Sequence, residues 1–466
     1  MTEFVFPKRV ADSSNKQKFP PLLKKQPLQI GLSEKETTDF SCGDYIILDF
    51  GKEMCGGIRI LTFLSKDATV RLRFGESLTE CSAEIGEKNA TNDHALRDFT
   101  AVLPSYSDLC LGNTGFRFVR IDFLSGNAKI KSVVAVNHIL KKRANYRYGG
   151  NSKEIKAIFS AAKRTIDLCS SGDYIWDGVK RDRLVWIGDM HPEMLALTTL
   201  YGKMDIIENS LNFVKDQTPL PEWMNGYPMY SMWWIIIVAD YFERTGAEDF
   251  TKEQLPYLCA LLSQLDSCVL EDGTLNYPSY FVDWPTHGQE DEIHGVRAIN
   301  ILCGKKAIEL LKEFSMDTSV AERMLAKLYK IPIMPKHSKQ VTALKFFVTE
   351  LTEEDKIRLT KNGAQGMSTF MGYYILKAVA SFDKTAATNM MKEYYGAMLK
   401  CGATTFFEDF DIAWAENSSR IDRHPKKNER DIHGDFGAFC YKGFRHSLCH
   451  GWAAGVLAFI KEEIGE

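Results

Sequence analysis

The spacing of apolar residues changes once along the chain, near residue 148, and this change constrains the fold more than any other feature. Residues 44–137 contain short segments in which apolar and polar residues alternate, such as DYIILDF, TVRLRF and FRFVRIDF, separated by Gly, Asp, Asn and Ser. A period of two is typical of strands that bury one face. Beyond residue 148, apolar residues recur at spacings of three and four, as they do in amphipathic helices. The sequence therefore predicts a β domain followed by a helical domain.

The helical part contains a series of amphipathic segments joined by loops rich in polar and aromatic residues. These segments are residues 151–168, 190–201, 206–215, 229–245, 253–270, 295–314, 318–330, 353–358, 368–381, 384–401 and 446–464. About a dozen helices joined in this way suggest antiparallel hairpins arranged as an (α/α)6 barrel. A solenoid is the alternative, and the sequence lacks the fixed-period repeat that solenoids show.

We expect three parts along the 466 residues. They are an N-terminal extension (residues 1–43), an antiparallel β-sandwich domain (44–146) and an (α/α)6-barrel catalytic domain (147–466). The chain is long enough for this, since single cores rarely grow beyond about 250–300 residues. The apolar residues at 4–6 suggest that the extension docks as an edge strand, whereas the Lys and Ser residues nearby fit a free arm equally well.

Charge and composition exclude several classes of partner. The 58 Lys and Arg residues nearly balance the 61 Asp and Glu residues, which argues against nucleic acid or an anionic membrane. No apolar run reaches the length of a signal peptide or a membrane span. The 11 cysteines include no C-x-x-C pair, which suggests reduced thiols rather than a zinc site or a disulfide framework. We expect a cytoplasmic protein that binds a small molecule; its oligomeric state stays open.

The segment WDGVKRDRLVWIGDM, residues 176–190, is the densest cluster of functional groups in the chain. It holds three aspartates, three basic residues and two tryptophans. Any one of these aspartates could simply cap a helix or pair with an arginine. Together, acids held by arginines and flanked by indole rings fit a ligand that is rich in hydroxyl groups. Pyranose sugars need this combination of carboxylate contacts and an apolar face.

Three later segments add to this composition. GATTFFEDFD contains Glu408 in a carboxylate-rich loop, and YPSYFVDWPTHG places Asp283 beside Trp284. In RHSLCHGW, His446 and His450 lie four residues apart at the start of the last predicted helix, a spacing that can bind a metal. No acidic residue lies between them, so we favour hydrogen-bond donors in a sugar pocket, or packing, and expect no metal.

Other chemistries lack their motifs. The sequence has no G-x-S-x-G elbow, no P-loop and no G-x-G-x-x-G after a strand. Acids and aromatic residues are what glycoside hydrolysis requires, because one carboxyl group protonates the leaving oxygen while another activates water or attacks carbon.

The segment at residues 176–190 resembles the signature D-x-x-x-R-[ED]-R-x-x-W-x-G-D of the α-L-rhamnosidases of glycoside hydrolase family 78. The fixed positions are filled by Asp177, Arg181, Asp182, Arg183, Trp186, Gly188 and Asp189. GATTFFED is similar to the family's G-A-T-T-x-W-E segment, and SLCHGW to its S-x-C-H-G-W segment. The β domain is similar to the one that precedes the barrel in that family, so the resemblance covers about residue 44 to the C-terminus.

The resemblance implies a role for each candidate residue. Asp182 would be the general acid and Glu408 the general base of an inverting hydrolysis that uses no cofactor. The remaining candidates would bind the sugar: Asp177, Arg181, Trp186, Asp189, Asp283, Trp284 and His450. The sequence departs from the family in having Asp182 where many members have glutamate, which leaves Asp189 as an alternative acid. It also has FFE in place of the usual WE.

The resulting hypothesis is a glycosidase that removes terminal α-L-rhamnose from a small glycoside or short oligosaccharide. Two alternatives stay open. One is a sister glycosidase on the same barrel, acting on another deoxy sugar or on an unsaturated uronide whose carboxylate an arginine would bind. The other is a sugar-binding protein without catalytic activity.

Overall fold

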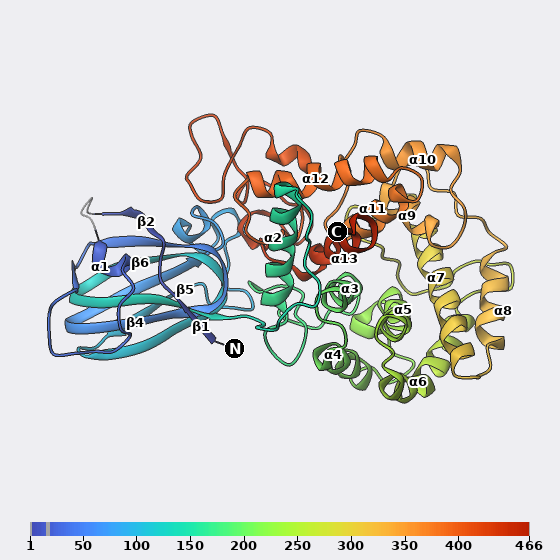
Figure 1. The fold of residues 1–466 in the computed structure, drawn as a ribbon, viewed down its shortest axis with the longest axis horizontal. Helices are drawn as coiled ribbons and strands as arrows, with labels where there is room; N and C mark the ends of the chain where they lie inside the picture. The colour runs from blue at the N-terminus through green and yellow to red at the C-terminus, as the bar shows by residue number, and fades with distance from the viewer. Residues whose placement is uncertain (1, 15–18, 466) are drawn as a thin grey trace.

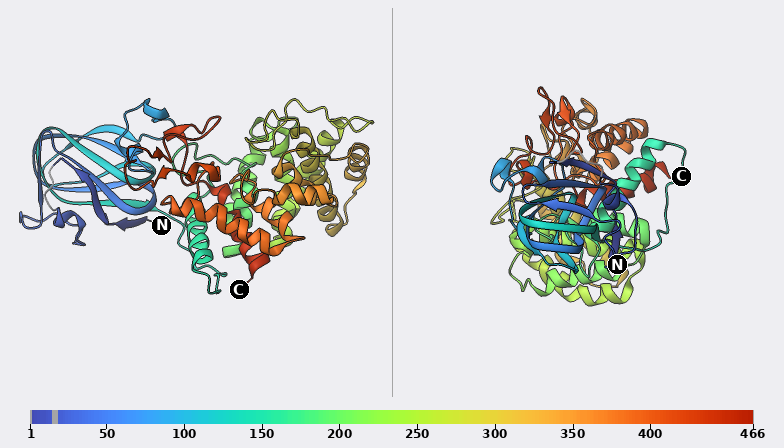
Figure 2. Two further views of the ribbon diagram at one scale, coloured as in Figure 1. Left: turned by 90° about the horizontal axis from the view of Figure 1, so that it is seen from above. Right: turned by 90° about the vertical axis from the view of Figure 1, so that its left-hand side faces the viewer.

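The protein consists of an antiparallel β-sheet domain and a helical domain. The computed structural model describes residues 2–14 and 19–465. Figure 1 shows the sheet domain at the left, in blue to cyan, and Figure 2 shows that it forms one end of an elongated molecule. The change from strands to helices falls between β6 (Ser107–His138) and α2 (Lys153–Cys169). The predicted order of a β domain and a helical domain is therefore confirmed.

Two long strands form most of the sheet. β4 (Tyr45–Gly75) and β6 pair antiparallel along most of their length, with several register shifts that bend them. Ile58 pairs with Leu111 on one side and with Ala135 on the other. The sheet therefore curls around its own core, where Phe116 packs edge-on against Phe50 and Phe74. It differs from the predicted sandwich in that the strands on both faces belong to one continuous sheet.

The first forty residues, as far as they are described, belong to the same sheet. β1 (Thr2–Val5) and β3 (Thr38–Ser41) pair with β6, while β2 (Arg9–Ser13) and β5 (Asp98–Leu103) pair with β4. A short helix, α1 (Pro20–Leu23), lies between β2 and β3. Strands on both sides of the predicted boundary at residue 43 thus share one sheet, and the N-terminal segment docks as an edge strand.

The helical domain contains a closed ring of contacts. Its helices after α2 are α3 (Met190–Tyr201), α4 (Asp205–Asp216), α5 (Pro228–Thr245), α6 (Glu248–Ser267), α7 (Glu292–Glu313), α8 (Ser319–Leu328), α9 (Lys339–Phe346), α10 (Glu353–Thr360), α11 (Gly372–Ala380), α12 (Lys384–Lys400) and α13 (Val456–Phe459). In sequence order, α3, α5, α7, α9, α11 and α13 each contact the next, and α13 contacts α3. The even-numbered helices lie between them in sequence. In the part of the chain that the structure describes, no helix is long and apolar enough to cross a membrane.

The last helical segment begins later than the sequence pattern predicts. A 3-10 helix (Gly451–Gly455) precedes α13, and a π turn (Ile460–Ile464) follows it. His450 has the extended angles φ −130° and ψ 129° and forms an isolated bridge with Gly178. The expectation that His446 and His450 share the first turn of a helix is therefore wrong, and with it the i, i+4 geometry.

The sheet domain contacts the loop of residues 176–190 at Gly115 of β6. A Cβ atom at this position would lie 2.8 Å from a methyl carbon of Val179 and 2.9 Å from the backbone nitrogen of Lys180. Thr114 donates a hydrogen bond to the carbonyl oxygen of Lys180 at 3.3 Å. The strand thus fits against the backbone of the loop, with no space for a side chain.

We expect Gly115→Ala to destabilise the protein by about 1–3 kcal/mol, because the added methyl group overpacks the contact between the domains. Gly172→Ala is a matched control, since a Cβ there meets nothing within 4 Å, and it should change stability by less than about 0.5 kcal/mol. Chemical denaturation of both variants tests this. Equal stabilities would mean that the close approach of β6 to the loop does not matter.

Candidate active site

The loop that carries most of the predicted site residues contains a strained turn. Asp182 and Arg183 have φ values of 56° and 57°, in the left-handed region. This conformation costs a residue other than glycine about 1–3 kcal/mol and persists only when surrounding contacts hold it. Asp177 provides two such contacts with Leu184, the residue that follows the turn. Its backbone N–H donates a hydrogen bond to the carbonyl oxygen of Leu184, and its carboxylate accepts one from the backbone N–H of Leu184 at 2.9 Å.

The nine predicted site residues gather around two adjoining cavities of about 510 and 430 Å³. The larger cavity is lined by eight of them: Asp177, Arg181, Asp182, Trp186, Asp189, Trp284, Glu408 and His450. Asp283 lines the smaller cavity, and Asp189, Trp284 and Glu408 line both. Residues more than 200 positions apart in the sequence therefore meet at one site, as with Arg181 and Glu408.

Arg181 connects the two carboxylates to which the family resemblance gives catalytic roles, Asp182 and Glu408. One terminal nitrogen of its guanidinium group lies 2.5 Å from Oε1 of Glu408, and the other lies 3.1 Å from Oδ1 of Asp182. Its Nε donates to the carbonyl oxygen of Arg445 at 3.0 Å. Arg181 is buried, with 4% of its surface exposed. A planar, buried guanidinium with these three contacts fixes the relative positions of both acids.

Glu408 is held on all sides. Its second oxygen, Oε2, accepts a hydrogen bond from the backbone N–H of Ser447 at 2.9 Å. Its backbone oxygen accepts bonds from Thr369 and from the indole N–H of Trp452. Burial raises the pKa of Glu408 above its ordinary value, while the positive charge of Arg181 opposes this. The result is a rigid carboxyl group that takes up a proton more readily than an exposed glutamate.

His450 lies among three buried carboxyl groups. Its Nε2 is 3.5 Å from Glu408, 3.7 Å from Asp177 and 3.9 Å from Asp189. Burial, followed by repulsion between neighbouring carboxylates, raises the pKa of both aspartates well above the usual range. Burial and nearby Arg181 lower the pKa of His450. The two aspartates therefore take up a proton more readily than exposed ones, and neutral His450 offers both a donor and an acceptor, which suits the binding of sugar hydroxyls.

The second cavity combines an acid with aromatic rings. Asp283 accepts hydrogen bonds from the hydroxyl of Ser368 at 2.9 Å and from the backbone N–H of Thr286 at 3.1 Å. Burial raises its pKa to about 6. Beside it, Trp284 stacks on Phe439 with a centroid distance of 5.2 Å. This part of the site offers a polar group next to flat apolar surfaces.

Three aromatic residues that the sequence analysis did not single out also line the cavities: Tyr230, Tyr441 and Trp452. Tyr441 and Trp452 are buried, and Tyr230 is partly buried. Tyr230 packs edge-on against Trp186, and Tyr441 lies 5.2 Å below the guanidinium of Arg181. Their only signal in the sequence is that they lie in segments dense in glycine and aromatic residues.

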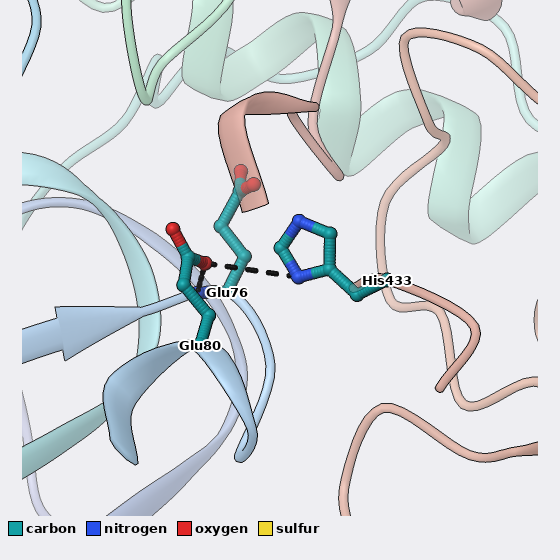
Figure 3. A group of neighbouring side chains, drawn as sticks. All are labelled: Glu76, Glu80 and His433. Carbon is teal, nitrogen blue, oxygen red and sulfur yellow. Dashed lines mark hydrogen bonds and ion pairs between the residues drawn. The ribbon is translucent and has the colours of Figure 1, made fainter. Parts of the chain in front are cut away.

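A second buried cluster lies between the two domains and holds three potential metal ligands: Glu76, Glu80 and His433 (Figure 3). The ammonium group of Lys180 is already among them. Its Nζ lies 2.8 Å from Glu80, 3.4 Å from Glu76 and 3.5 Å from Nε2 of His433. It also donates to the carbonyl oxygens of Phe444 and His446. The lysine thus supplies the positive charge that these buried carboxylates need.

The cluster is connected to the candidate active site through Glu76. This residue of the sheet domain accepts hydrogen bonds from the hydroxyl of Ser447 at 3.1 Å and from the backbone N–H of Leu448 at 2.7 Å. The backbone N–H of Ser447 in turn binds Glu408. Burial raises the pKa of Glu76 to about 7. The sheet domain therefore fixes the segment that holds Glu408.

Sequence comparison finds no match, whereas comparison of structures finds proteins with the same fold. No family model matches the chain, and no curated protein does either. A rhamnosidase from Klebsiella oxytoca with rhamnose bound matches with a TM-score of 0.72 and 18% identity, over 92% of this chain and 89% of its own. The α-L-rhamnosidases share their fold with this chain. A GH78 family rhamnosidase of Bacillus sp. GL1 matches with a TM-score of 0.73 and 16% identity, over 95% of this chain.

The match extends to longer members of the same group of structures. The Streptomyces avermitilis α-L-rhamnosidase in complex with L-rhamnose has a TM-score of 0.65 and 13% identity, over 91% of this chain. This chain corresponds to 48% of the Bacillus protein and 43% of the Streptomyces protein. It thus has the length of the Klebsiella protein and about half that of the other two.

Lys180→Met should destabilise the protein by about 3–5 kcal/mol, because it leaves Glu76 and Glu80 buried without their cation. Lys252→Met is the control: Lys252 pairs with Glu248 on the surface of α6, and such pairs contribute less than about 1 kcal/mol. Urea denaturation measures both. If Lys180→Met unfolds at the wild-type midpoint, its ammonium group does not hold the domains together.

Proposed function

We propose that the protein is an inverting glycoside hydrolase that removes terminal α-L-rhamnose from a small glycoside or short oligosaccharide. One observation carries this proposal: Arg181 holds Asp182 and Glu408 at the edge of one cavity, in a chain with the fold of the α-L-rhamnosidases. The ring formed by α3, α5, α7, α9, α11 and α13 supports an (α/α)6 barrel, with the cavity at the ends of its helices.

In the proposed reaction, Asp182 is the general acid. Its carboxyl group gives a proton to the glycosidic oxygen, the bond between that oxygen and the anomeric carbon breaks, and the aglycone leaves as an alcohol. Glu408 is the general base: it takes a proton from a water molecule whose oxygen bonds to the anomeric carbon from the opposite face. Each turnover therefore moves one proton out of Asp182 and one into Glu408.

Arg181 gives this pair a defined spacing. The two terminal nitrogens of a guanidinium group are about 2.3 Å apart, so Oδ1 of Asp182 and Oε1 of Glu408 lie no more than about 8 Å apart. An inverting enzyme needs its two carboxyl groups about 6.5 Å or more apart, so that a water molecule fits between the base and the sugar. The upper limit of about 8 Å allows such a separation. Arg181 also favours the ionised form of Glu408, which a base requires.

The remaining residues bind the sugar in this proposal. Asp177, Asp189 and His450 surround one end of the larger cavity and would hold the ring hydroxyls. Asp283 would bind a further hydroxyl, and Trp186 and Trp284 would face apolar edges of the deoxy sugar. The deoxy sugar carries a methyl group in place of a hydroxymethyl group, and this methyl group would pack against the tryptophan rings.

The structure weighs against the uronide alternative. A sister enzyme for unsaturated uronides needs a cation that is free to bind the substrate carboxylate. Arg181 already binds two carboxylates, Arg445 binds Asp93, and Arg183 donates to the carbonyl oxygen of Val179. The alternative of a binding protein without activity is tested directly by hydrolysis.

Purified wild-type protein should release p-nitrophenol from p-nitrophenyl α-L-rhamnopyranoside. Glu408→Gln and Asp182→Asn keep the shape of each side chain and remove its acid–base function, so we expect each to lower kcat by about 100-fold or more. NMR of the first product should show β-L-rhamnose if the reaction inverts. Activity that survives in Asp182→Asn would assign the acid to Asp189, and binding of rhamnose without turnover would favour a sugar-binding protein.

The pH profile should show the environment of Glu408. A base works only when it is ionised, and burial raises the pKa of Glu408 above its ordinary value of 4.5. Activity should therefore fall as the pH drops through a midpoint above 4.5. A profile of kcat/KM from about pH 4 to about pH 9 measures this midpoint. A midpoint below 4.5 would mean that Arg181 outweighs burial.

A further inference from the structure

Two glutamates of the sheet domain, Glu76 and Glu80, lie in the same buried cluster but bind different groups (Figure 3). Oε2 of Glu80 accepts a hydrogen bond from the backbone N–H of Glu76 at 2.8 Å, and Oε1 lies 2.8 Å from Nζ of Lys180. Glu76 instead uses both of its oxygens to bind the helical domain. Oε1 accepts a bond from the hydroxyl of Ser447, and Oε2 accepts one from the backbone N–H of Leu448. Of the two glutamates, Glu76 therefore holds the segment at residues 447–448.

The same segment holds the candidate base. The backbone N–H of Ser447 donates to Oε2 of Glu408 at 2.9 Å, and its carbonyl oxygen accepts a bond from the backbone N–H of Glu408 at 3.0 Å. The carboxyl group of Glu76 is thus separated from the candidate base by a single residue. Glu76, Ser447 and Glu408 are buried, with 0%, 1% and 3% of their surfaces exposed. A bond lost between them would leave a buried polar group without its partner, which is costly.

Glu76 is also connected to the loop that carries the candidate acid. Its Oε2 lies 3.4 Å from Nζ of Lys180. The next residue, Arg181, contacts both Asp182 and Glu408. Glu76 directly follows β4, the longest strand that pairs with β6, so its backbone is part of a rigid sheet. One side chain therefore links this sheet to the segment of the base and to the loop of the acid.

We propose that Glu76 is a positioning residue for the general base: it holds Ser447 and Leu448 so that the backbone N–H of Ser447 stays bonded to Glu408. This inference rests on the proposed function. Glu76 acts through Ser447 and does not itself contact the sugar or the attacking water. The spacing between base, water and anomeric carbon then depends on a residue of the sheet domain.

Loss of this anchor should change Glu408 in two ways. A carboxyl group that moves by about 1 Å can lose about 100-fold in rate. The pKa of Glu408 should also rise further, because burial raises it and the bond from Ser447, which stabilises the ionised form, opposes that rise. The charged groups that face Glu408, namely Arg181, Asp182 and His450, are left in place. A changed pKa would therefore report the position of Ser447.

Glu76→Gln and Glu80→Gln form a matched pair of variants. Each replaces a carboxylate beside Lys180 with an amide of the same shape, but Glu76→Gln also leaves one acceptor oxygen in place of two for the bonds from Ser447 and Leu448. With p-nitrophenyl α-L-rhamnopyranoside, we expect kcat of Glu76→Gln to fall about 10-fold or more with little change in KM. The acid limb of its pH profile should move to higher pH. Glu80→Gln should keep the wild-type kcat and acid limb.

A merely structural role of Glu76 would lower the amount of folded protein without moving the acid limb. Circular dichroism at the assay temperature checks that both variants are folded. Equal losses of kcat in the two variants would assign the effect to the charge beside Lys180 and would overturn the inference.

A second measurement does not depend on turnover. NMR titration of the full chain, with an isotope label in the glutamate carboxyl groups, gives the pKa of Glu408, whose signal is identified by its loss in Glu408→Gln. We expect this pKa to be higher in Glu76→Gln than in wild type and unchanged in Glu80→Gln. If wild type hydrolyses the rhamnoside but Glu76→Gln keeps its kcat and titration, the inference is wrong and the proposed function stands. If wild type is inactive, the proposed function fails, and an unchanged titration of Glu408 in Glu76→Gln would reject the positioning role as well.

Discussion

Two consecutive cations, Lys180 and Arg181, organise this protein. Lys180 is buried against Glu76 and Glu80 of the sheet domain, and Arg181 is buried against Asp182 and Glu408 of the helical domain. Buried charges are tolerated only when they are paired and hydrogen-bonded. The ion pairs of Lys180 and Arg181 therefore depend on the exact position of the loop at residues 176–190. The left-handed turn at Asp182 and Arg183 helps to set that position. The loop cannot move from one domain without losing a charge pair in the other.

This arrangement makes the sheet domain a part of the candidate active site. Gly115 lets β6 approach the loop backbone, Glu76 holds the segment that binds Glu408, and His94 contacts Asp182. The cavity lies in the helical domain, and Arg181 and Ser447 of that domain bind the candidate catalytic carboxylates directly. The sheet domain holds these groups in turn, since Glu76 binds Ser447 and Gly115 fits against the loop that carries Arg181.

The features that depend on local sequence patterns could be predicted from the sequence. Period-two alternation located the β domain, helical spacing located most helices, and the acid-rich segments at residues 176–190 and 402–411 met at one cavity. It missed α9, whose eight residues, KQVTALKF, have no clear apolar stripe, and it placed the last helix too early. It also gave no signal for Lys180 or Glu76 as parts of the site. Their partners lie in other segments, and the left-handed turn at Asp182 and Arg183 contains neither glycine nor asparagine to indicate it.

The pairing of Arg181 with Glu408 spans 227 residues of sequence, and this separation bears on how the molecule reaches its native state. Contacts between distant segments form late, because a long loop must close before they stabilise anything. The sheet domain, made from residues 2–14 and 19–138, can fold while the chain is still being synthesised, with Glu76 and Glu80 still hydrated. The loop at residue 180 then has only half of its partners until the segment around Ser447 arrives. We therefore expect the candidate site to assemble late in folding, because a chain that ends before Ser447 holds the acids without the contacts that orient them.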